Sequence, residues 1–163
     1  MKNNISNSIN KVIEVLNEAR SMELCGISQY MNHHYILDDA DYVKLAKEMK
    51  RIAIDEMKHA ESFAERIKDI DSTCEPITEI KGIITKGQKI DVIYEHDKIS
   101  ESETIYKYNE FAKICRENND IISATLFERI TLEEQEHLNY FDDTATHIKE
   151  LGNSFLARQT ANG

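Results

Sequence analysis

The stretch CEPITEIKGIITKGQ, Cys74–Gln88, interrupts a chain whose remaining sequence is largely typical of helices. It contains the only proline of the chain and two of its five glycines, and both residue types favour turns and irregular backbone over helix. It is long enough to carry the chain from one end of a helical bundle to the other. We therefore predict that this stretch is a crossover between two pairs of helices and not a hairpin turn.

On both sides of this crossover, apolar residues recur at intervals of three and four, which is typical of amphipathic helices. This periodicity predicts four long helices, over about 8–36, 41–70, 89–117 and 121–151, and a short fifth helix over 153–159. The fold class is therefore all-α. We expect a single domain over 1–163, built as a four-helix bundle with the long crossover between helices 2 and 3.

The helix ends carry their own signals. Asn118, Asn119 and Asp120 offer turn and N-cap chemistry between the third and fourth helices. Gly152 is a helix stop, and Asn153 or Ser154 is expected to cap the short fifth helix.

Composition narrows the classes of function. The chain has 163 residues, of which 40% are hydrophobic and 31% charged, and its net charge is −10. This acidic balance argues against nucleic-acid binding, which requires clustered Lys and Arg, and makes metal cations the better partners. Three scattered cysteines without a CxxC pair, and an N-terminus without a long apolar run, predict a cytoplasmic protein with no membrane segment.

Each apolar stripe is interrupted by glutamate, and on two helices also by histidine, at positions where the helical period calls for a core residue. These residues are Glu23 on the first helix, Glu56 and His59 on the second, Glu101 on the third, and Glu134 and His137 on the fourth. Burying one unpaired carboxylate costs on the order of 20 kcal/mol in the idealised limit and still several kcal/mol after relaxation. Four of them in one core therefore require a cationic partner.

The spacing of these residues indicates what that partner is. EMKH and EQEH each place a carboxylate and an imidazole one helical turn apart. The acids of each helix pair are equally far apart, since 56 − 23 = 33 and 134 − 101 = 33, so all four lie at similar depth in an antiparallel bundle. Four negative charges are balanced by two divalent ions, and we predict a dinuclear metal site.

These motifs resemble those of bacterioferritin, a ferritin-like family with a di-iron site. The resemblance covers about residues 8–158 and is carried by the segments ELCGISQY (Glu23–Tyr30), IDEMKHAE (Ile54–Glu61), LEEQEH (Leu132–His137) and the tail LGNSFLARQ. It implies that Glu23 and Glu101 are terminal ligands, that Glu56 and Glu134 bridge the two irons, and that His59 and His137 each bind one iron.

The resemblance also implies a function. Such proteins are ferroxidases that oxidise ferrous ions with dioxygen or peroxide and store the iron inside homo-oligomeric shells of 24 subunits. Two alternatives stay open: a rubrerythrin-like di-iron peroxidase, and a helical bundle whose polar core serves metal binding or partner interaction without catalysis. Rubrerythrins usually carry a further glutamate at the position of Thr104, and its absence favours the bacterioferritin interpretation.

Two further residues have roles by the same resemblance. Tyr30 lies two turns beyond Glu23 and matches a tyrosine beside the di-iron site, as either an electron donor or a core residue that bonds a carboxylate. Met57 matches a methionine that binds haem b between two subunits, with packing at a dimer interface as the alternative.

Other polar residues receive plainer interpretations. Asp55 and Glu133, which precede the proposed bridging acids, could accept the outer N–H of the ligand histidines. The histidines outside the two EXXH motifs are expected at the surface or in packing, and they are His33, His34, His96 and His147. Of these, His96 could also bind metal transiently.

Overall fold

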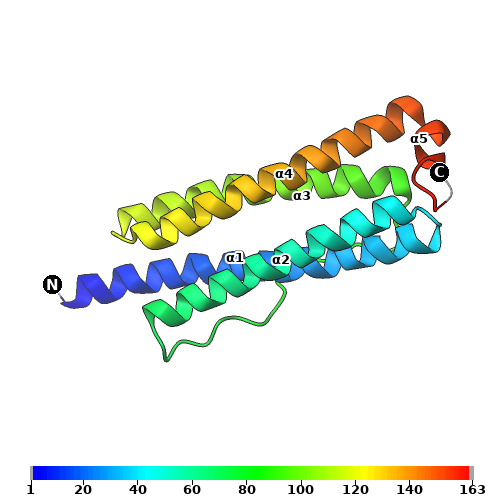
Figure 1. Cartoon of the computed structure of the whole chain (residues 1–163). Coiled ribbons are helices and arrows are strands. Elements are labelled where there is room, and N and C mark those ends of the chain that lie inside the picture. The colour runs from blue at the N-terminus through cyan, green and yellow to red at the C-terminus, as the bar shows by residue number, and fades with distance from the viewer. Residues whose placement is uncertain (1, 162–163) are drawn as a thin grey trace.

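The computed structural model describes residues 2–161 and contains five helices joined by short turns and one long connection (Figure 1). The helices are α1 (Lys2–Asp39), α2 (Val43–Ile70), α3 (Ile90–Glu117), α4 (Ile121–Leu151) and α5 (Asn153–Ala157). One antiparallel hairpin is formed by α1 and α2 and another by α3 and α4, and the two hairpins pack together mainly through α1 and α3. The predicted all-α bundle with a long middle connection is confirmed.

The helix bounds differ from the predicted ones mainly at α1, which begins at Lys2 instead of residue 8 and ends at Asp39 instead of residue 36. A helix can extend beyond its apolar stripe because each added residue contributes another backbone hydrogen bond. Asp41 has a φ of 62°, so α2 begins at Val43 and not at residue 41. The short helix α5 ends at Ala157 instead of residue 159.

The junction between α3 and α4 has the predicted chemistry. Asn119 adopts a left-handed conformation with a φ of 62°, which asparagine tolerates better than most residues. The Asp120 side chain accepts a hydrogen bond from the Ser123 backbone N–H at 2.9 Å and caps α4. Gly152 ends α4 as predicted, but no side chain caps α5, so the expected cap by Asn153 or Ser154 is wrong.

The crossover lies along α1, and polar side chains of that helix hold its backbone. Asn17 Oδ1 accepts from the Ile77 N–H at 2.8 Å, and Gln29 exchanges hydrogen bonds with the backbone of Thr85 at 2.8 and 2.9 Å. These bonds satisfy peptide groups that have no partner in regular structure. Gly82 comes so close to α1 that a Cβ there would lie 2.4 Å from Cys25 Sγ.

Two apolar clusters fill the bundle, one on each side of its middle. The first apolar cluster lies toward the N-terminal end of α1 and includes Val12, Leu16, Ala19, Phe63, Ile67, Tyr108, Phe111, Cys115, Phe127 and Ile130. The second apolar cluster lies toward the other end and includes Tyr30, Leu37, Leu45, Met49, Ile52, Ile93, Tyr94, Phe141 and Ala145. Each large side chain that is fully buried contributes about 1.5–3 kcal/mol to stability.

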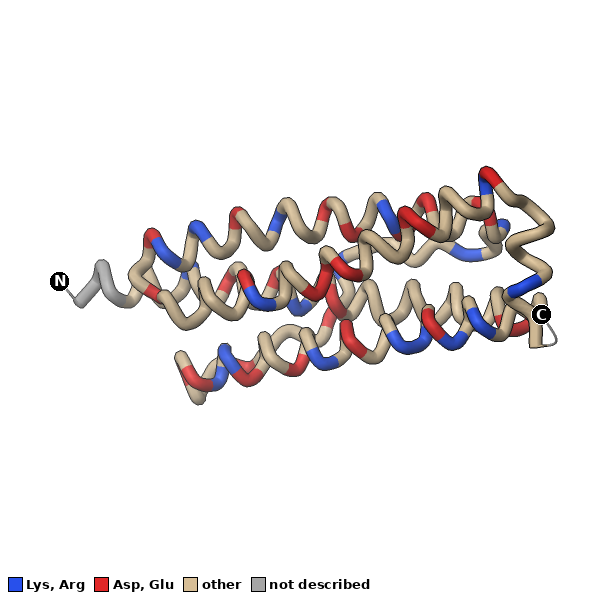
Figure 2. Tube along the Cα trace, turned by 45° about the horizontal axis from the view of Figure 1, so that its top comes forward, with Lys and Arg blue, Asp and Glu red and all other residues tan. Residues whose placement is uncertain are grey.

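Charged residues of both signs follow all four long helices (Figure 2), with 30 acidic residues against 20 basic ones. Within the part of the chain that the structure describes, no helix combines the length and the apolar character needed to cross a lipid bilayer.

Candidate metal centre

The layer between the two apolar clusters is built from charged residues. Its members come from all four long helices and are each 3% exposed or less: Glu23, Glu56, His59, Glu101, Glu134 and His137. The helical period places these residues on the core face of their helices, and the equal reach of the two hairpins brings them to one depth. We call this set the charged layer.

Donor atoms in the charged layer fall into two groups, and within each group all donor atoms lie within 4.8 Å of one another. One group contains Glu23, Glu56, His59 and Glu134, and the other contains Glu56, Glu101, Glu134 and His137. Glu56 and Glu134 belong to both groups. The geometry therefore suits two neighbouring metal ions that share two carboxylates.

The two histidines present the same nitrogen to this layer. His59 Nδ1 lies 3.0 Å from Glu134 Oε1 and 3.6 Å from Glu56 Oε2. His137 Nδ1 lies 3.0 Å from Glu56 Oε1 and 3.1 Å from Glu134 Oε2. The imidazole rings stack with centroids 6.1 Å apart. Each Nδ1 therefore faces both shared carboxylates.

A constant offset relates the two halves of the layer. The residues of the charged layer repeat after 78 positions, because 101 − 23, 134 − 56 and 137 − 59 all equal 78. The same offset relates Tyr30 to Tyr108. The two hairpins therefore place equivalent polar residues at equivalent positions along their helices.

Two tyrosines hold Glu23 and Glu101, the carboxylates that each belong to only one of the two donor groups. Tyr30 donates its phenolic O–H to Glu101 Oε1, and Tyr108 donates to Glu23 Oε1. Both tyrosines are buried, and each bond joins α1 to α3. Sequence reasoning singled out Tyr30 but not Tyr108. Its separation of seven residues from Glu101, equal to that of Tyr30 from Glu23, was the available signal.

The outer nitrogens of the histidines also face carboxylates. Glu133 Oε2 lies at hydrogen-bond distance, 3.1 Å, from His59 Nε2, as predicted. Asp55 Oδ2 lies 3.7 Å from His137 Nε2, which is too long for a hydrogen bond, and it pairs instead with Arg51 at 2.5 Å. The predicted hydrogen bond of Asp55 is therefore absent.

Some polar atoms of the charged layer make no well-formed hydrogen bond among the described residues, although His59 Nδ1 lies 3.0 Å from Glu134 Oε1 and His137 Nδ1 lies 3.0 Å from Glu56 Oε1. These buried atoms are Glu56 Oε1, Glu134 Oε1 and His59 Nδ1. These ion-pair contacts satisfy the three atoms only in part, and a buried polar atom left fully unpaired costs about 1–3 kcal/mol, and more when it is charged. All three are oxygen or nitrogen donors of the kind that bind iron, manganese or zinc, so the residues present fit a metal centre.

The electrostatics of the layer agree with this conclusion. Burial raises the pKa of Glu23 and Glu101 well above the usual value, and the charges of Glu56 and Glu134 raise it further. Burial of the ring lowers the pKa of His59, but the nearby carboxylates outweigh this effect and raise it to about 11. The metal-free layer therefore balances its charge with protons, and a metal ion that binds there must displace them.

Met57 lies outside this layer. It follows Glu56 on α2 and is 52% exposed, so it lies at the surface of the chain. His34 bonds the Ala46 carbonyl at 2.8 Å, and His147 packs against Phe155, which agrees with the packing roles predicted for these two histidines.

Four long helices with a middle crossover and a buried layer of four glutamates and two histidines define the ferritin-like class of metal-carboxylate bundles. A family model described as "Ferritin-like domain" matches residues 13–151. The bacterioferritin of Desulfovibrio desulfuricans is 56% identical over 148 residues, which cover 91% of this chain and 82% of that protein. The chain belongs to the bacterioferritin family.

Solved structures agree with this assignment. An X-ray structure of the D. desulfuricans bacterioferritin describes its diiron site in different catalytic states. It matches this chain with a TM-score of 0.93 and 53% sequence identity, and the match covers 96% of this chain and 90% of that chain. The Rhodobacter capsulatus bacterioferritin, described with a metal-free dinuclear site and with haem iron in a crystallographic special position, has a TM-score of 0.88 and 29% identity. It covers 93% of this chain and 94% of its own.

Proposed function

We propose that this chain stores and detoxifies iron as a ferroxidase, with the charged layer as its di-iron centre. The observation that carries this proposal is the pair of donor groups that share Glu56 and Glu134 in the middle of the bundle. Membership of the bacterioferritin family gives the same function.

The donor groups suggest a role for each ligand. Glu23 and His59 would bind one iron, and Glu101 and His137 would bind the other. Glu56 and Glu134 would bridge them. Hard carboxylate oxygens favour the ferric state, and imidazole suits both oxidation states, so this ligand set supports oxidation of bound ferrous ions.

When bound, the two ferrous ions would supply one electron each, and these two electrons with two protons would reduce one dioxygen to hydrogen peroxide or one hydrogen peroxide to two waters. The protein contributes position and charge. The O–H groups of Tyr30 and Tyr108 fix the carboxylates of Glu101 and Glu23, so that both terminal ligands face the middle of the layer. Glu133 accepts from the outer nitrogen of His59 and orients its ring.

The test removes both bridges. In a variant with Glu56→Ala and Glu134→Ala, we expect oxidation of two ferrous ions per chain to slow by on the order of 100-fold or more, since even residues behind metal ligands change activity 10–100-fold. Oxygen uptake and absorbance report the rate. The matched control replaces Glu61 and Glu136, exposed glutamates of the same two helices, by Ala. Equal rates in the bridge variant and the control would contradict the proposal.

Tyr30 is proposed to donate an electron during oxidation as well as to hold Glu101. Its support is the direct hydrogen bond to a ligand, but Tyr108 makes the equivalent bond and so offers an internal control. Tyr30→Phe should slow ferrous oxidation several-fold more than Tyr108→Phe does. Equal effects of the two variants would reduce Tyr30 to a positioning residue.

Met57 is proposed as a ligand of haem b, shared with the same residue of a second chain. Its support is the exposed position of Met57, with the exposed Ile54 nearby on the same helix. Haem would supply a route for electrons that release stored iron. After reconstitution with haem we expect a Soret band in the native protein and its loss in Met57→Leu, with Met22→Leu as control. A band that persists in Met57→Leu would reject this site.

We also propose that the chains assemble into a closed shell of 24 copies in the cytoplasm, with dioxygen or peroxide as the oxidant. The family implies a homo-oligomer, and the free thiols of Cys25, Cys74 and Cys115 suit a reducing compartment. The native mass in solution, measured with light scattering, should correspond to about 24 chains of 18.9 kDa each. A stable dimer as the largest species would contradict the shell.

A further inference from the structure

A second cluster of metal-binding residues lies outside the charged layer. His33 on α1 and His96 and Asp97 on α3 each place one donor atom within 4.8 Å of the other two. None of the three belongs to an EXXH motif, and His33 and Asp97 are 64 residues apart in the chain. The cluster forms only because α1 and α3 pack against each other.

The geometry of this cluster centres on one carboxylate. Asp97 Oδ2 lies 2.9 Å from His33 Nδ1, and Asp97 Oδ1 lies 3.0 Å from His96 Nδ1. The two imidazole rings are perpendicular, with centroids 5.6 Å apart. His33 and Asp97 are fully buried. Two imidazole nitrogens of the same kind thus converge on both oxygens of one buried aspartate.

The ring of His33 is fixed from behind. Its Nε2 lies 2.5 Å from Gln88 Oε1, at the end of the crossover, and this oxygen can accept the Nε2 N–H when Nδ1 binds an ion. Gln29 Nε2 lies 2.7 Å from the same ring nitrogen but is itself a donor, so it does not accept this proton. Gln29 is tied to the backbone of Thr85. Metal-binding histidines usually have a partner such as the Gln88 oxygen on their second nitrogen, which orients the ring and leaves the first nitrogen for the ion.

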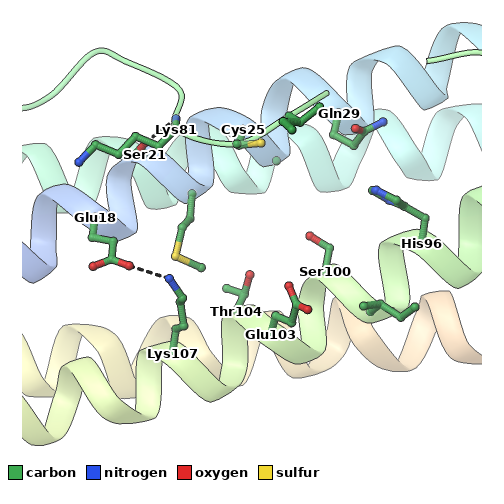
Figure 3. Close-up of a pocket in the computed structure, with 15 residues that line it drawn as sticks. Glu18, Ser21, Cys25, Gln29, Lys81, His96, Ser100, Glu103, Thr104 and Lys107 are labelled. Atoms are coloured by element: carbon green, nitrogen blue, oxygen red, sulfur yellow. Dashed lines mark hydrogen bonds and ion pairs between the residues drawn. The ribbon is translucent and has the colours of Figure 1, made fainter. Parts of the chain in front are cut away.

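The cluster borders a pocket of about 650 Å³ between α1, α3 and the crossover, and His96 is its member that lines this pocket. Figure 3 shows Gln29 and His96 at one end of this pocket, on facing helices, with Ser100 and Glu103 further along α3. The side chain of His96 is 32% exposed, so it connects the buried pair to the pocket. An ion in the pocket would meet His96 first.

We propose that His33, His96 and Asp97 form a mononuclear site for a divalent transition-metal ion such as Fe²⁺ or Zn²⁺. Two imidazoles and one carboxylate are a common ligand set for these ions and leave coordination positions open to water from the pocket. Asp97 supplies one negative charge, and the nearby carboxylate of Glu103, whose charge acts on His96, offsets the second positive charge. This site is separate from the charged layer, although Asp97 stands one helical turn before Glu101.

The test uses Co²⁺ on the assembled protein. Crystals loaded with Co²⁺ should show anomalous density for three ions per chain, two in the charged layer and a third among His33, His96 and Asp97. His96→Ala and Asp97→Asn should each lose the third ion and keep the other two, which verifies that the variants fold. The control His147→Ala, which removes an exposed histidine of α4, should keep all three.

Two results would overturn the proposal. One is the absence of density at this cluster in the native protein, whatever the charged layer binds, which would reduce the three residues to a buried ion pair. The other is a third ion that remains in both His96→Ala and Asp97→Asn. Because each position is seen separately, a failure here is distinct from a failure of the di-iron centre.

Discussion

The two ends of the bundle bury apolar side chains, whereas its middle buries carboxylates. Toward the ends, apolar side chains such as Phe127 and Phe141 are fully buried and packed in aromatic contacts, with Phe63 and Phe127 rings 5.1 Å apart. In the middle, four carboxylates are buried to the same extent, and some of their oxygens make ion-pair contacts but no well-formed hydrogen bond among the described residues. The same four helices therefore carry both a stabilising core and a costly one.

This contrast shows how the fold divides its tasks. Burial of apolar area at the ends stabilises the chain enough to hold charged residues together between them. The middle gives up stability in the absence of metal and regains it when cations displace the protons of the layer. Substitutions in the two regions should therefore act in opposite directions on the metal-free protein.

The largest effect is expected at the end of the bundle. Phe127→Ala removes a fully buried ring from the first apolar cluster and should lower the free energy of unfolding of the metal-free protein by about 3–5 kcal/mol. Urea unfolding at fixed protein concentration measures this change. Phe155→Ala, in the half-buried α5, is the control and should cost much less. A similarly small loss of unfolding free energy in both variants would contradict the stabilising role assigned to the ends of the bundle.

In the middle, neutralising carboxylates should stabilise the metal-free protein. Because the pKa of Glu23 and Glu101 is raised by burial, these groups disfavour folding above their unfolded pKa of about 4.3. Glu23→Gln with Glu101→Gln should therefore raise the free energy of unfolding at pH 7 by about 1–3 kcal/mol. The gain should fade below about pH 4, where both carboxyl groups are protonated in either state.

The same double variant should also lose the stabilisation that added ferrous or manganous ions give the native protein. Thermal unfolding with and without metal measures both effects. A double variant that is less stable than the native protein at pH 7 without metal would show that the middle of the bundle is not costly.

The smallest effect is expected at the turn before α4. Burial alone would raise the pKa of Asp120, but hydrogen bonds from Ser123 and the guanidinium of Arg66 lower it. Asp120 thus stabilises the fold above its unfolded pKa of about 3.9, and this contribution is lost as pH falls through the lower folded value. Because the pair is only partly buried, Asp120→Ala should cost about 1 kcal/mol at pH 7 in urea unfolding.

Asp120→Asn keeps a capping side chain and is the matched control, since it removes only the charge. The contribution of the Asp120 carboxylate to the free energy of unfolding grows as pH rises, whereas that of Glu23 and Glu101 falls. A stability loss for Asp120→Ala that does not shrink at low pH would contradict the assigned role of the carboxylate.

The helices and the charged layer were predictable because both follow from periodicity within single helices. A carboxylate on an apolar stripe is conspicuous, and Glu23 or Glu134 could be identified without knowing their neighbours. The crossover was evident because it contains Pro76, Gly82 and Gly87, and such residues break helical patterns.

Contacts between elements far apart in the sequence were not predictable in this way. Asn17 and Gln29 look like surface residues of α1, yet they hold the crossover. Tyr108 follows Glu101 by seven residues, as Tyr30 follows Glu23, but this spacing does not show that Tyr108 bonds Glu23 on α1. His33 has no partner on its own helix except Gln29, and its aspartate lies on α3. Periodicity reports which face of a helix is buried, but not which residue of another helix it meets.

The most direct test of the central claim is anomalous diffraction at the iron edge from crystals loaded anaerobically with ferrous ions. We expect two iron positions per chain in the charged layer, each with one histidine, and both bound by Glu56 and Glu134. A single iron position there, or two irons that share neither glutamate, would contradict the account.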